Sequence, residues 1–282
     1  MPSIIDSTAT AAVSPELVSS FVQAVLAESA ILITSVDDRS TEVGPGMSTL
    51  DIGRRGQLSS ESKAEGTDYN AQAFSWVADK LAIDKQEGIY TKLTKKAGVQ
   101  SAVDQEMEIL KASAQALVDK LEAQLYAELI KVSTTSPDHV VAFGTASTIA
   151  LADILNARKL LRTQNVPADA DLFLAISPAQ EAQLLALEQF IDASRYGSTS
   201  ALQNGEIGRI YGFRVLVTNA VTANTAIAYH RSHVAFARQV EVSWEATRNL
   251  KESCTEYLLE TMYGLKVLDA GKRGVLMNNS GT

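Results

Sequence analysis

The sequence predicts an α+β protein with one long surface helix, a small α/β domain and a group of C-terminal strands. Residues 99–132 repeat apolar side chains every three or four positions with charged residues between them, as in a helix with one buried face. Residues 172–176 form a continuous apolar run, which is typical of a buried strand. Val240, Val242 and Trp244 alternate with polar residues, the pattern of a half-buried strand.

The composition restricts the class of protein. With 282 residues, 46% of them apolar and 21% charged, the chain has enough apolar material for one large core or two modest ones. No apolar run approaches the roughly 20 residues that span a bilayer. Cys254 is the only cysteine, so an intrachain disulfide is excluded and a reducing cytosol is expected. The net charge of −8 would on average repel a polyanion, so direct DNA recognition is not expected.

The first forty residues predict an N-terminal arm with a short helix. Residues 1–13 are small and polar and show no periodicity. A helix is expected to begin at residues 14–16, where serine is followed by proline and glutamate. Leu17 and Phe21 lie on one face of this helix, which can pack on its own domain or on a neighbouring subunit. The sequence pattern favours neither of these two packing partners.

A long hairpin is predicted within residues 41–85. Leu50 and Ile52 alternate with polar residues before a polar stretch, and Phe74 and Trp76 alternate after it. Such a pattern on both sides of a polar segment is typical of two paired strands.

The outer part of this hairpin, residues 53–66, has too little apolar surface to be buried in its own domain. Its partner is therefore expected on another molecule. Arg54 and Arg55 could contact an acidic surface of another subunit, although an exposed arginine pair is often simply solvated.

The helix over residues 99–132 is the longest predicted element. At about 1.5 Å per residue, roughly thirty-four residues reach about 50 Å, so an elongated molecule is expected. A coiled coil is the alternative, but alanine and tyrosine interrupt a strict apolar seam. Residues 84–98 are interpreted as a polar link into the helix, and the breaker-rich residues 134–138 as a domain boundary after it.

An α/β pattern follows. A second helix is predicted over residues 149–161, and the strand at 172–176 leads into Ser177 and Gln180, which form a capping box for the next helix. Another strand is predicted at 213–217. Strand, capped helix and strand together indicate an α/β layer.

The C-terminal part of the chain is predicted to be β structure that packs on the long helix. Strands are expected at residues 226–229, 240–244, 257–268 and 275–277, the last after a tight turn. The predicted division is an arm (1–40), an extended hairpin (41–85), a peripheral domain with the spine helix (86–138 and 236–282) and an inserted axial α/β domain (139–235).

No motif indicates a catalytic, cofactor or metal site. His230 and His233 have the wrong spacing for two metal ligands on one strand, and we interpret both as surface or satisfied polar residues. The glycines at 205, 208 and 212 precede a strand, whereas phosphate-binding loops precede a helix, so we interpret them as turn residues. We predict no catalytic residue, no cofactor and no metal ligand.

Acidic pairs and the cysteine give weaker signals. Asp37 with Asp38, and Asp169 with Asp171, could bind a cation, although acidic residues in turns more often cap backbone amides. Cys254 has no histidine near it in the sequence, so a nucleophile is not indicated.

Several segments carry a family resemblance: residues 158–161, the turn at 165–167, the strand and cap at 172–178, Tyr196 with Gly197, residues 205–215, and a further match at 263–268. They resemble the major capsid proteins of tailed bacteriophages with the Hong Kong 97-type fold. The resemblance is most specific over residues 158–219 and covers most of the chain more loosely. That family has an N-terminal arm, an extended loop, a peripheral domain with a spine helix and an axial domain in this order.

The resemblance implies a structural protein and not an enzyme. Many copies would assemble as pentamers and hexamers into an icosahedral shell that encloses double-stranded DNA without sequence-specific binding. The short region before the hairpin implies a separate scaffolding protein, and a portal and a decoration protein are further expected partners, with no membrane. The expected location is the virion, after assembly in the host cytoplasm.

The resemblance also names candidate contacts between subunits, because the extended loop of the family crosses the adjacent subunit. The candidates are Arg54, Arg55, Lys63, Leu17 and Phe21. The founding member joins its subunits by a Lys–Asn isopeptide bond, for which Lys63 with Asn278 or Asn279 has the ingredients. A noncovalent shell is nevertheless expected, because lysine and asparagine are common.

Two alternatives remain open from the sequence. An encapsulin, the shell protein of a cellular compartment, shares the fold and would enclose protein cargo. A soluble α/β enzyme of unrecognised type could use the acidic residues near Asp169. Particle size would distinguish an enzyme from a shell. The cargo, protein or DNA, would distinguish an encapsulin from a phage shell.

Overall fold

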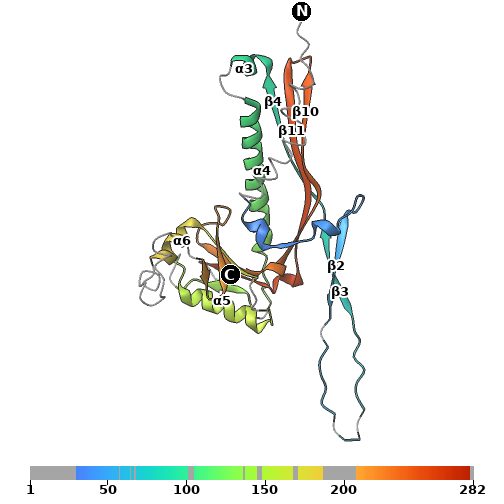
Figure 1. Cartoon of the computed structure of the whole chain (residues 1–282). Coiled ribbons are helices and arrows are strands. Elements are labelled where there is room, and N and C mark those ends of the chain that lie inside the picture. The colour runs from blue at the N-terminus through green and yellow to red at the C-terminus, as the bar shows by residue number, and fades with distance from the viewer. Residues whose placement is uncertain are drawn as a thin grey trace, which may run out of the picture.

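The computed structural model describes residues 30–56, 58–63, 65–66, 68–100, 105–135, 137–144, 148–167, 171–186 and 208–279. The described chain is elongated and contains three sheets (Figure 1). A four-stranded sheet runs along the long helix, a six-stranded sheet forms a body at one end, and a two-stranded hairpin extends away from both. The elongated shape predicted from the helix length is confirmed.

The long helix α4 (Gln105–Leu129) packs on the four-stranded sheet. In spatial order the strands are β1 (Asp37–Asp38), β10 (Val234–Asn249), β11 (Cys254–Val267) and β4 (Lys85–Thr94). Leu110 and Leu117 of the helix are buried with Trp244 and Tyr257, whose rings stack at 5.1 Å. The helix on a sheet is as predicted, although α4 ends three residues before the predicted end at 132.

The prediction of a polar link at residues 84–98 is wrong. Strand β4 occupies most of it and pairs with β11 along its whole length, and the short helix α3 (Lys95–Gln100) follows. Of the five side chains of β4 on its less exposed side, only Ile89 and Leu93 are large and apolar. The alternation was therefore too weak to indicate a strand from the sequence.

The six-stranded sheet has the order β5-β12-β9-β6-β8-β7. Its strands are β5 (Val140–Ala142), β12 (Gly274–Asn278), β9 (Thr225–His230), β6 (Leu172–Ile176), β8 (Phe213–Val217) and β7 (Arg209–Ile210). Helices α5 (Leu151–Thr163) and α6 (Pro178–Leu185) share one apolar core with one face of the sheet. The predicted buried strand is confirmed, because all five residues of β6 are buried.

The predicted capping box at the start of α6 is confirmed. The backbone N–H of Ser177 donates to Oε1 of Gln180 over 3.0 Å, and Pro178 occupies the first helical position. This cap turns the chain from the buried strand β6 directly into a helix.

Strand β12 lies elsewhere than predicted. The strand at 275–277 was expected beside the spine helix, but β12 pairs with β9 and β5 in the six-stranded sheet. Val275 and Met277 are fully buried in the core beneath α5. The short apolar run fits either sheet, so the sequence could not select one.

One buried carboxylate joins three segments of the chain. Oε1 of Glu122, on α4, accepts a hydrogen bond from the backbone N–H of Leu32 over 3.1 Å. Its Oε2 accepts from the hydroxyl of Thr218, which follows β8, over 2.7 Å. Glu122 therefore fixes the spine helix both to the segment before the hairpin and to the six-stranded sheet.

Candidate subunit-contact surfaces

The root of the hairpin is fixed to the body of the chain. Strands β2 (Thr49–Arg55) and β3 (Trp76–Ala82) pair antiparallel along their full length, which confirms the predicted hairpin. Leu50 and Leu81 are buried against Ala235, Ala237 and Leu268. The hairpin therefore leaves the body from a small apolar core of its own chain.

A glycine allows this root to pack closely on β11. A Cβ atom on Gly264 would collide with the carbonyl of Ala82 and would lie 2.9 Å from a methyl group of Leu81. Only a residue without a side chain fits here, because real Cβ atoms do not approach backbone atoms so closely.

Arg54 acts within its own chain. Its guanidinium pairs with Asp79 of β3, with 3.6 Å between Nε and Oδ2, and bonds the carboxylate of Asp269 after β11. The backbone N–H of Asp269 also donates to Asp79 over 3.1 Å. Its charge is therefore compensated within the chain, and the predicted contact of Arg54 with another subunit stays a prediction. Arg55 is exposed on the opposite face of β2.

The outer part of the hairpin lacks an apolar core in the described residues. Its two sides are connected by polar side chains: Asn70 bonds Glu61, Gln72 bonds Ser59, and the ammonium of Lys63 lies 5.0 Å from the ring centroid of Tyr69. Figure 1 shows this part extending well beyond the body.

An aromatic ledge marks the neck of the hairpin. The rings of Phe74 and Trp76 meet edge to face at 5.5 Å, and Trp76 lies over Gly53 of the facing strand. Trp76 is 65% exposed and Phe74 is 49% exposed. Arg55 is the direct cross-strand neighbour of Trp76. Exposed aromatic and arginine side chains placed together are typical of the centre of a protein interface.

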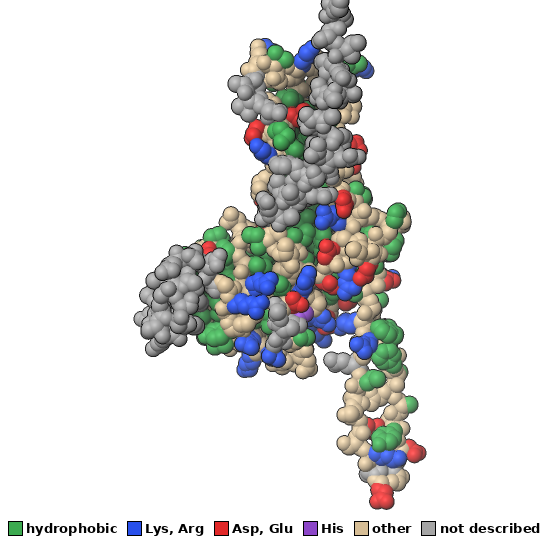
Figure 2. Space-filling model, in the orientation of Figure 1, with side chains coloured by type: hydrophobic (Ala, Val, Ile, Leu, Met, Phe, Trp, Pro, Cys, Tyr) green, Lys and Arg blue, Asp and Glu red, His purple; other side chains and the backbone are tan. Residues whose placement is uncertain are grey.

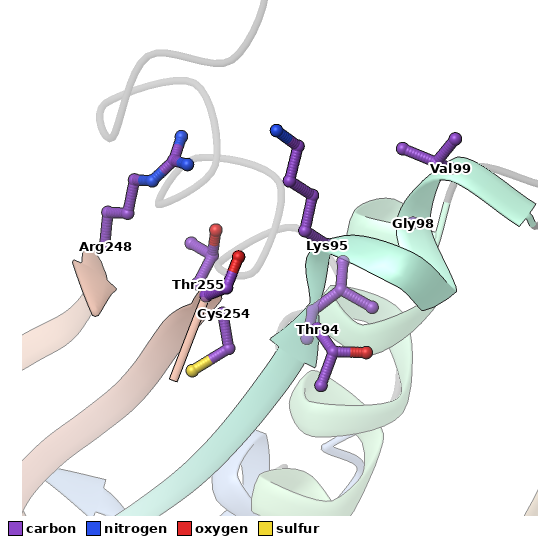
Figure 3. A pocket seen from close by; sticks show the side chains of 9 residues that line it. Thr94, Lys95, Gly98, Val99, Arg248, Cys254 and Thr255 are labelled. Carbon is purple, nitrogen blue, oxygen red and sulfur yellow. The ribbon is translucent and has the colours of Figure 1, made fainter. Parts of the chain in front are cut away.

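The far tip of the four-stranded sheet carries a second exposed surface. A cavity of about 240 Å³ lies between α3 and the β10–β11 turn, and Figure 3 shows the ends of Lys95 and Arg248 pointing outward around it. Leu250 and Val99, at this tip, are 80% and 76% exposed. The sulfur of Cys254 points away from the ends of both basic side chains (Figure 3).

The only cluster of potential metal ligands found in the described residues lies at the same tip. Glu252, Cys254 and Glu256 place their ligand atoms within 4.8 Å of one another. The ammonium of Lys92 lies 2.7 Å from Glu252 and 3.2 Å from Glu256, and hydrogen bonds from Asn249 and Lys92 lower the pKa of Glu256. Burial raises the pKa of the Cys254 thiol. A lysine thus already compensates these carboxylates, and the thiol is disfavoured as a thiolate.

The histidines lie at the connection between the two larger sheets. His230 bonds Ser232 over 2.8 Å and is a satisfied polar residue, as predicted. His233 is fully buried, with Nε2 3.0 Å from the carbonyl of Leu129 and, among the described residues, no hydrogen-bond partner for Nδ1. Burial lowers the pKa of His233 to about 4. Sequence reasoning did not predict this burial, because nothing in the local pattern places His233 against the end of α4.

Other predicted residues have simpler outcomes. Asp37 pairs with Arg39, and Asp38 accepts a hydrogen bond from the backbone N–H of Ser40 over 2.9 Å, so this pair caps a turn. Gly212 has a φ of +89° in the β7–β8 turn, as expected of a turn glycine. Leu17, Phe21 and Asp169 lie outside the described residues. None of the helices described is long and apolar enough to cross a membrane.

The comparisons with known proteins agree with this architecture. The family model described as phage capsid protein matches residues 78–247, which is more than half of the chain. The chain therefore belongs to the phage capsid protein family. No curated protein sequence matches it.

Solved phage structures share the fold. The structure of Mycobacterium phage Che8 aligns with a TM-score of 0.76 and 21% identity, and covers 90% of this chain and 92% of the other. The capsid structure of the cyanophage P-SCSP1u aligns with a TM-score of 0.70 and 15% identity, covering 88% of both chains. The chain has the α+β Hong Kong 97-type capsid fold, as the resemblance predicted, and its role is structural, in the shell of a phage particle.

Proposed function

We propose that this chain is a major capsid protein that assembles as pentamers and hexamers into an icosahedral shell around double-stranded DNA. The observation that carries the proposal is the hairpin, which extends beyond the body while the ledge of Phe74 and Trp76 remains exposed. Exposing an apolar ledge of this kind to water costs free energy. A neighbouring copy that covered the ledge would remove that cost.

The contacts proposed between subunits follow from the same hairpin. Arg55 and Lys63 are exposed beyond the root, so they remain candidates for contact with an adjacent copy. Leu17 and Phe21 remain candidates from the sequence alone. Arg54 remains a candidate as well, although it pairs with Asp79 and Asp269 of its own chain.

Further parts of the proposal concern partners and domains. We propose a separate scaffolding protein, a portal and a decoration protein as partners, with assembly in the host cytoplasm before the shell becomes part of the virion. We also keep the division into arm, extended hairpin, peripheral domain and axial domain, with β12 moved to the axial domain because it pairs with β9. The shell is proposed to be noncovalent.

The test is electron microscopy and gel filtration of the expressed full chain, with and without a scaffolding protein from the same phage. We expect closed particles of roughly tens of nanometres, with fivefold and sixfold clusters. DNA as the cargo would support a phage shell, whereas a protein cargo would indicate an encapsulin. A chain that stays a monomer or dimer under all these conditions would contradict the proposal.

A pair of variants tests the ledge itself. We expect Trp76→Ala to reduce the yield of shells at least tenfold, because the ledge loses its largest apolar surface. Trp76→Phe keeps an aromatic ring and serves as the matched control, so most of the yield is expected to remain. Equal yields for both variants and the wild type would show that this ledge is no contact between subunits.

A further inference from the structure

Three consecutive residues with positive φ connect the four-stranded sheet to the six-stranded sheet. They are Asp269, Ala270 and Gly271, with φ of +53°, +49° and +77°, and they lie between β11 and β12. The part of the chain that the structure describes contains no other run of three such residues. We call residues 269–271 the left-handed turn.

The left-handed conformation is unfavourable at Ala270 in particular. Glycine has no Cβ atom, and aspartate adopts positive φ more readily than most residues, so Gly271 and Asp269 tolerate the turn. Alanine has neither property, and in this conformation its Cβ atom comes too close to the following carbonyl oxygen. Ala270 is exposed, so burial of its methyl group does not offset the cost. Other contacts of the turn must therefore hold it.

The root of the hairpin supplies such contacts. The backbone N–H of Asp269 donates to Oδ2 of Asp79 on β3 over 3.1 Å, and its carboxylate bonds the guanidinium of Arg54 on β2. Figure 2 shows acidic and basic side chains next to one another on the body where the hairpin leaves it. Because Asp79 bonds the backbone of the turn, it fixes the orientation of the turn itself and not only of a side chain.

The other side of the turn contacts the chain just after the spine helix. The carbonyl of Gly271 accepts a hydrogen bond from the backbone N–H of Ser133 over 3.1 Å. Gly271 is buried, and a Cβ atom on it would lie 2.7 Å from the carbonyl oxygen of Lys131. The turn therefore lies between the root of the hairpin and the end of α4, and a change in its backbone would disturb both contacts.

The turn also fixes the start of β12. Nε of Arg273 lies 3.5 Å from Oδ2 of Asp269, and the backbone N–H of Lys272 donates to the carbonyl of Asp269 over 3.2 Å. On the preceding side, the backbone N–H of Leu268 donates to the carbonyl of His233 over 2.8 Å. A movement of the turn would therefore also reach the connection between the two larger sheets.

A tight connection between two strands does not by itself require alanine in this conformation. Asparagine or glycine suits a position of positive φ better, and asparagine occupies such positions at Asn165 and Asn224. Residues in unfavourable backbone conformations persist only where surrounding contacts determine them, and they are frequent in switch regions. Ala270 fits this description, because contacts from the hairpin and from the end of α4 meet at its two neighbours.

We propose that the left-handed turn is a strained element that couples the position of the hairpin to the end of α4 and the start of β12. The hairpin holds the turn in its left-handed form. When an adjacent copy displaces the hairpin, the turn relaxes and its contact with Ser133 loosens. This inference rests on the proposed function, because an adjacent copy is what would displace the hairpin. Coupling is reciprocal, so a disturbed turn also loosens the hairpin.

The first test breaks the contact on the hairpin side of the unassembled full chain. Asp79→Ala removes the acceptor of the Asp269 N–H, and hydrogen exchange is measured at the Ser133 amide. We expect exchange to become at least about fivefold faster, because a relaxed turn no longer holds that amide. The matched control is Asp51→Ala, which removes a carboxylate from the opposite face of the same hairpin and should change the rate less than about twofold. Unchanged Ser133 exchange in Asp79→Ala would overturn the proposal.

A second variant tests the strain itself. Ala270→Gly removes the Cβ atom, so the left-handed form becomes less unfavourable and Ser133 exchange should become about fivefold slower. Glycine at an unstrained position has the opposite effect, because it adds freedom to the unfolded chain. The double variant Asp79→Ala/Ala270→Gly should exchange more slowly than Asp79→Ala alone, which guards against a variant that merely misfolds. Faster exchange in Ala270→Gly than in the wild type would show that the turn is not strained.

The reverse direction of the coupling is tested with Gly271→Ala, whose Cβ atom would push the turn away from the carbonyl of Lys131. We expect the strand amides of β2 and β3 to exchange at least about threefold faster. Gly212→Ala is the matched control, because it places alanine at a φ of +89° in the β7–β8 turn of the six-stranded sheet. It should leave the exchange of β2 and β3 unchanged. Equal hairpin exchange in both variants would refute the coupling.

Shell formation distinguishes this inference from the proposed function. The exchange measurements use the unassembled chain, so their outcome does not depend on whether shells form. If the wild type forms no shells but shows the expected exchange, the proposed function fails and the coupling is supported. If shells form but Asp79→Ala leaves Ser133 exchange unchanged, the coupling is refuted and the proposed function stands.

Discussion

The hairpin and the six-stranded sheet are both built of β-strands, yet they are completed in different ways. Every residue of β6 is buried by its neighbours in the same chain, and Tyr229 of β9 is fully buried as well. The hairpin, in contrast, keeps Trp76 65% exposed. One region is therefore buried within the chain, whereas the other leaves a large aromatic side chain in water.

This difference follows from where the apolar residues lie. The core beside β6 receives side chains from both helices and from five strands of the sheet. The root of the hairpin packs on Ala235 and Ala237, whereas the described outer residues contribute no apolar core and are joined across the hairpin by contacts such as Asn70 with Glu61 and Gln72 with Ser59. Mutations in the first region should change the stability of the single chain, and mutations in the second should change assembly.

The largest expected effect is in the core of the six-stranded sheet. Leu174→Ala should lower the free energy of unfolding by about 2–5 kcal/mol, because Leu174 is fully buried and a cavity would remain. Urea unfolding of the unassembled chain measures this. The exposed Trp76→Ala should change the same quantity by no more than about 0.5 kcal/mol. Comparable losses for the two variants would refute the contrast between the regions.

The next effect concerns pH. Because the pKa of His233 is lowered to about 4 in the folded chain, the unfolded chain binds the proton more readily. Neutral His233 therefore contributes to the free energy of unfolding above about pH 6.5. This contribution, about 2–3 kcal/mol, is lost as the pH falls toward 4. Urea unfolding at several pH values should show this loss.

The control for this effect is His233→Gln, which can still donate to the carbonyl of Leu129 but does not titrate. The charged groups that act on His233 are His139, before β5, and Arg273, before β12, and both disfavour its protonation. A pH dependence between 6.5 and 4 that is unchanged in His233→Gln would assign the effect to other groups.

A somewhat smaller effect is expected where the two larger sheets meet. Glu122→Ala should lower the free energy of unfolding by about 1–3 kcal/mol, because the N–H of Leu32 and the hydroxyl of Thr218 would lose their buried acceptor. Glu122→Gln keeps one acceptor oxygen and should lose less. If Glu122→Ala unfolds at the wild-type urea concentration, this residue does not hold the segments together.

The smallest effect is expected at the root of the hairpin. Arg54→Ala removes ion pairs that are partly exposed, so the loss of stability should be about 1 kcal/mol or less. Hydrogen exchange should nevertheless become faster in the strand amides of β2 and β3, because the hairpin is then held mainly by Leu50 and Leu81. Arg55→Ala, whose side chain points away from Asp79 and Asp269, should leave this exchange unchanged.

Much of the fold could be predicted because its signals are local. The spacing of apolar residues identified α4, the run at 172–176 identified β6, and Ser177 with Gln180 identified the start of α6. In each case neighbouring residues carry the information, and the tertiary contacts agree with it.

The candidate contact surfaces could be predicted only in outline. The polar outer part of the hairpin indicated that it would lack a partner in its own chain. The compensation of Arg54 by Asp269 was not visible, because the two residues are 215 positions apart.

By itself, the sequence determined the helices and strands with strong periodicity, the exposure of the outer hairpin and the resemblance to capsid proteins. The tertiary structure alone decided that β4 is a strand, that β12 joins the six-stranded sheet and that His233 is buried. The physical reason is that these features depend on which surface a segment meets. Ile89 and Leu93 supply too few apolar contacts to reveal that surface locally, and β11 supplies it from a distant part of the chain.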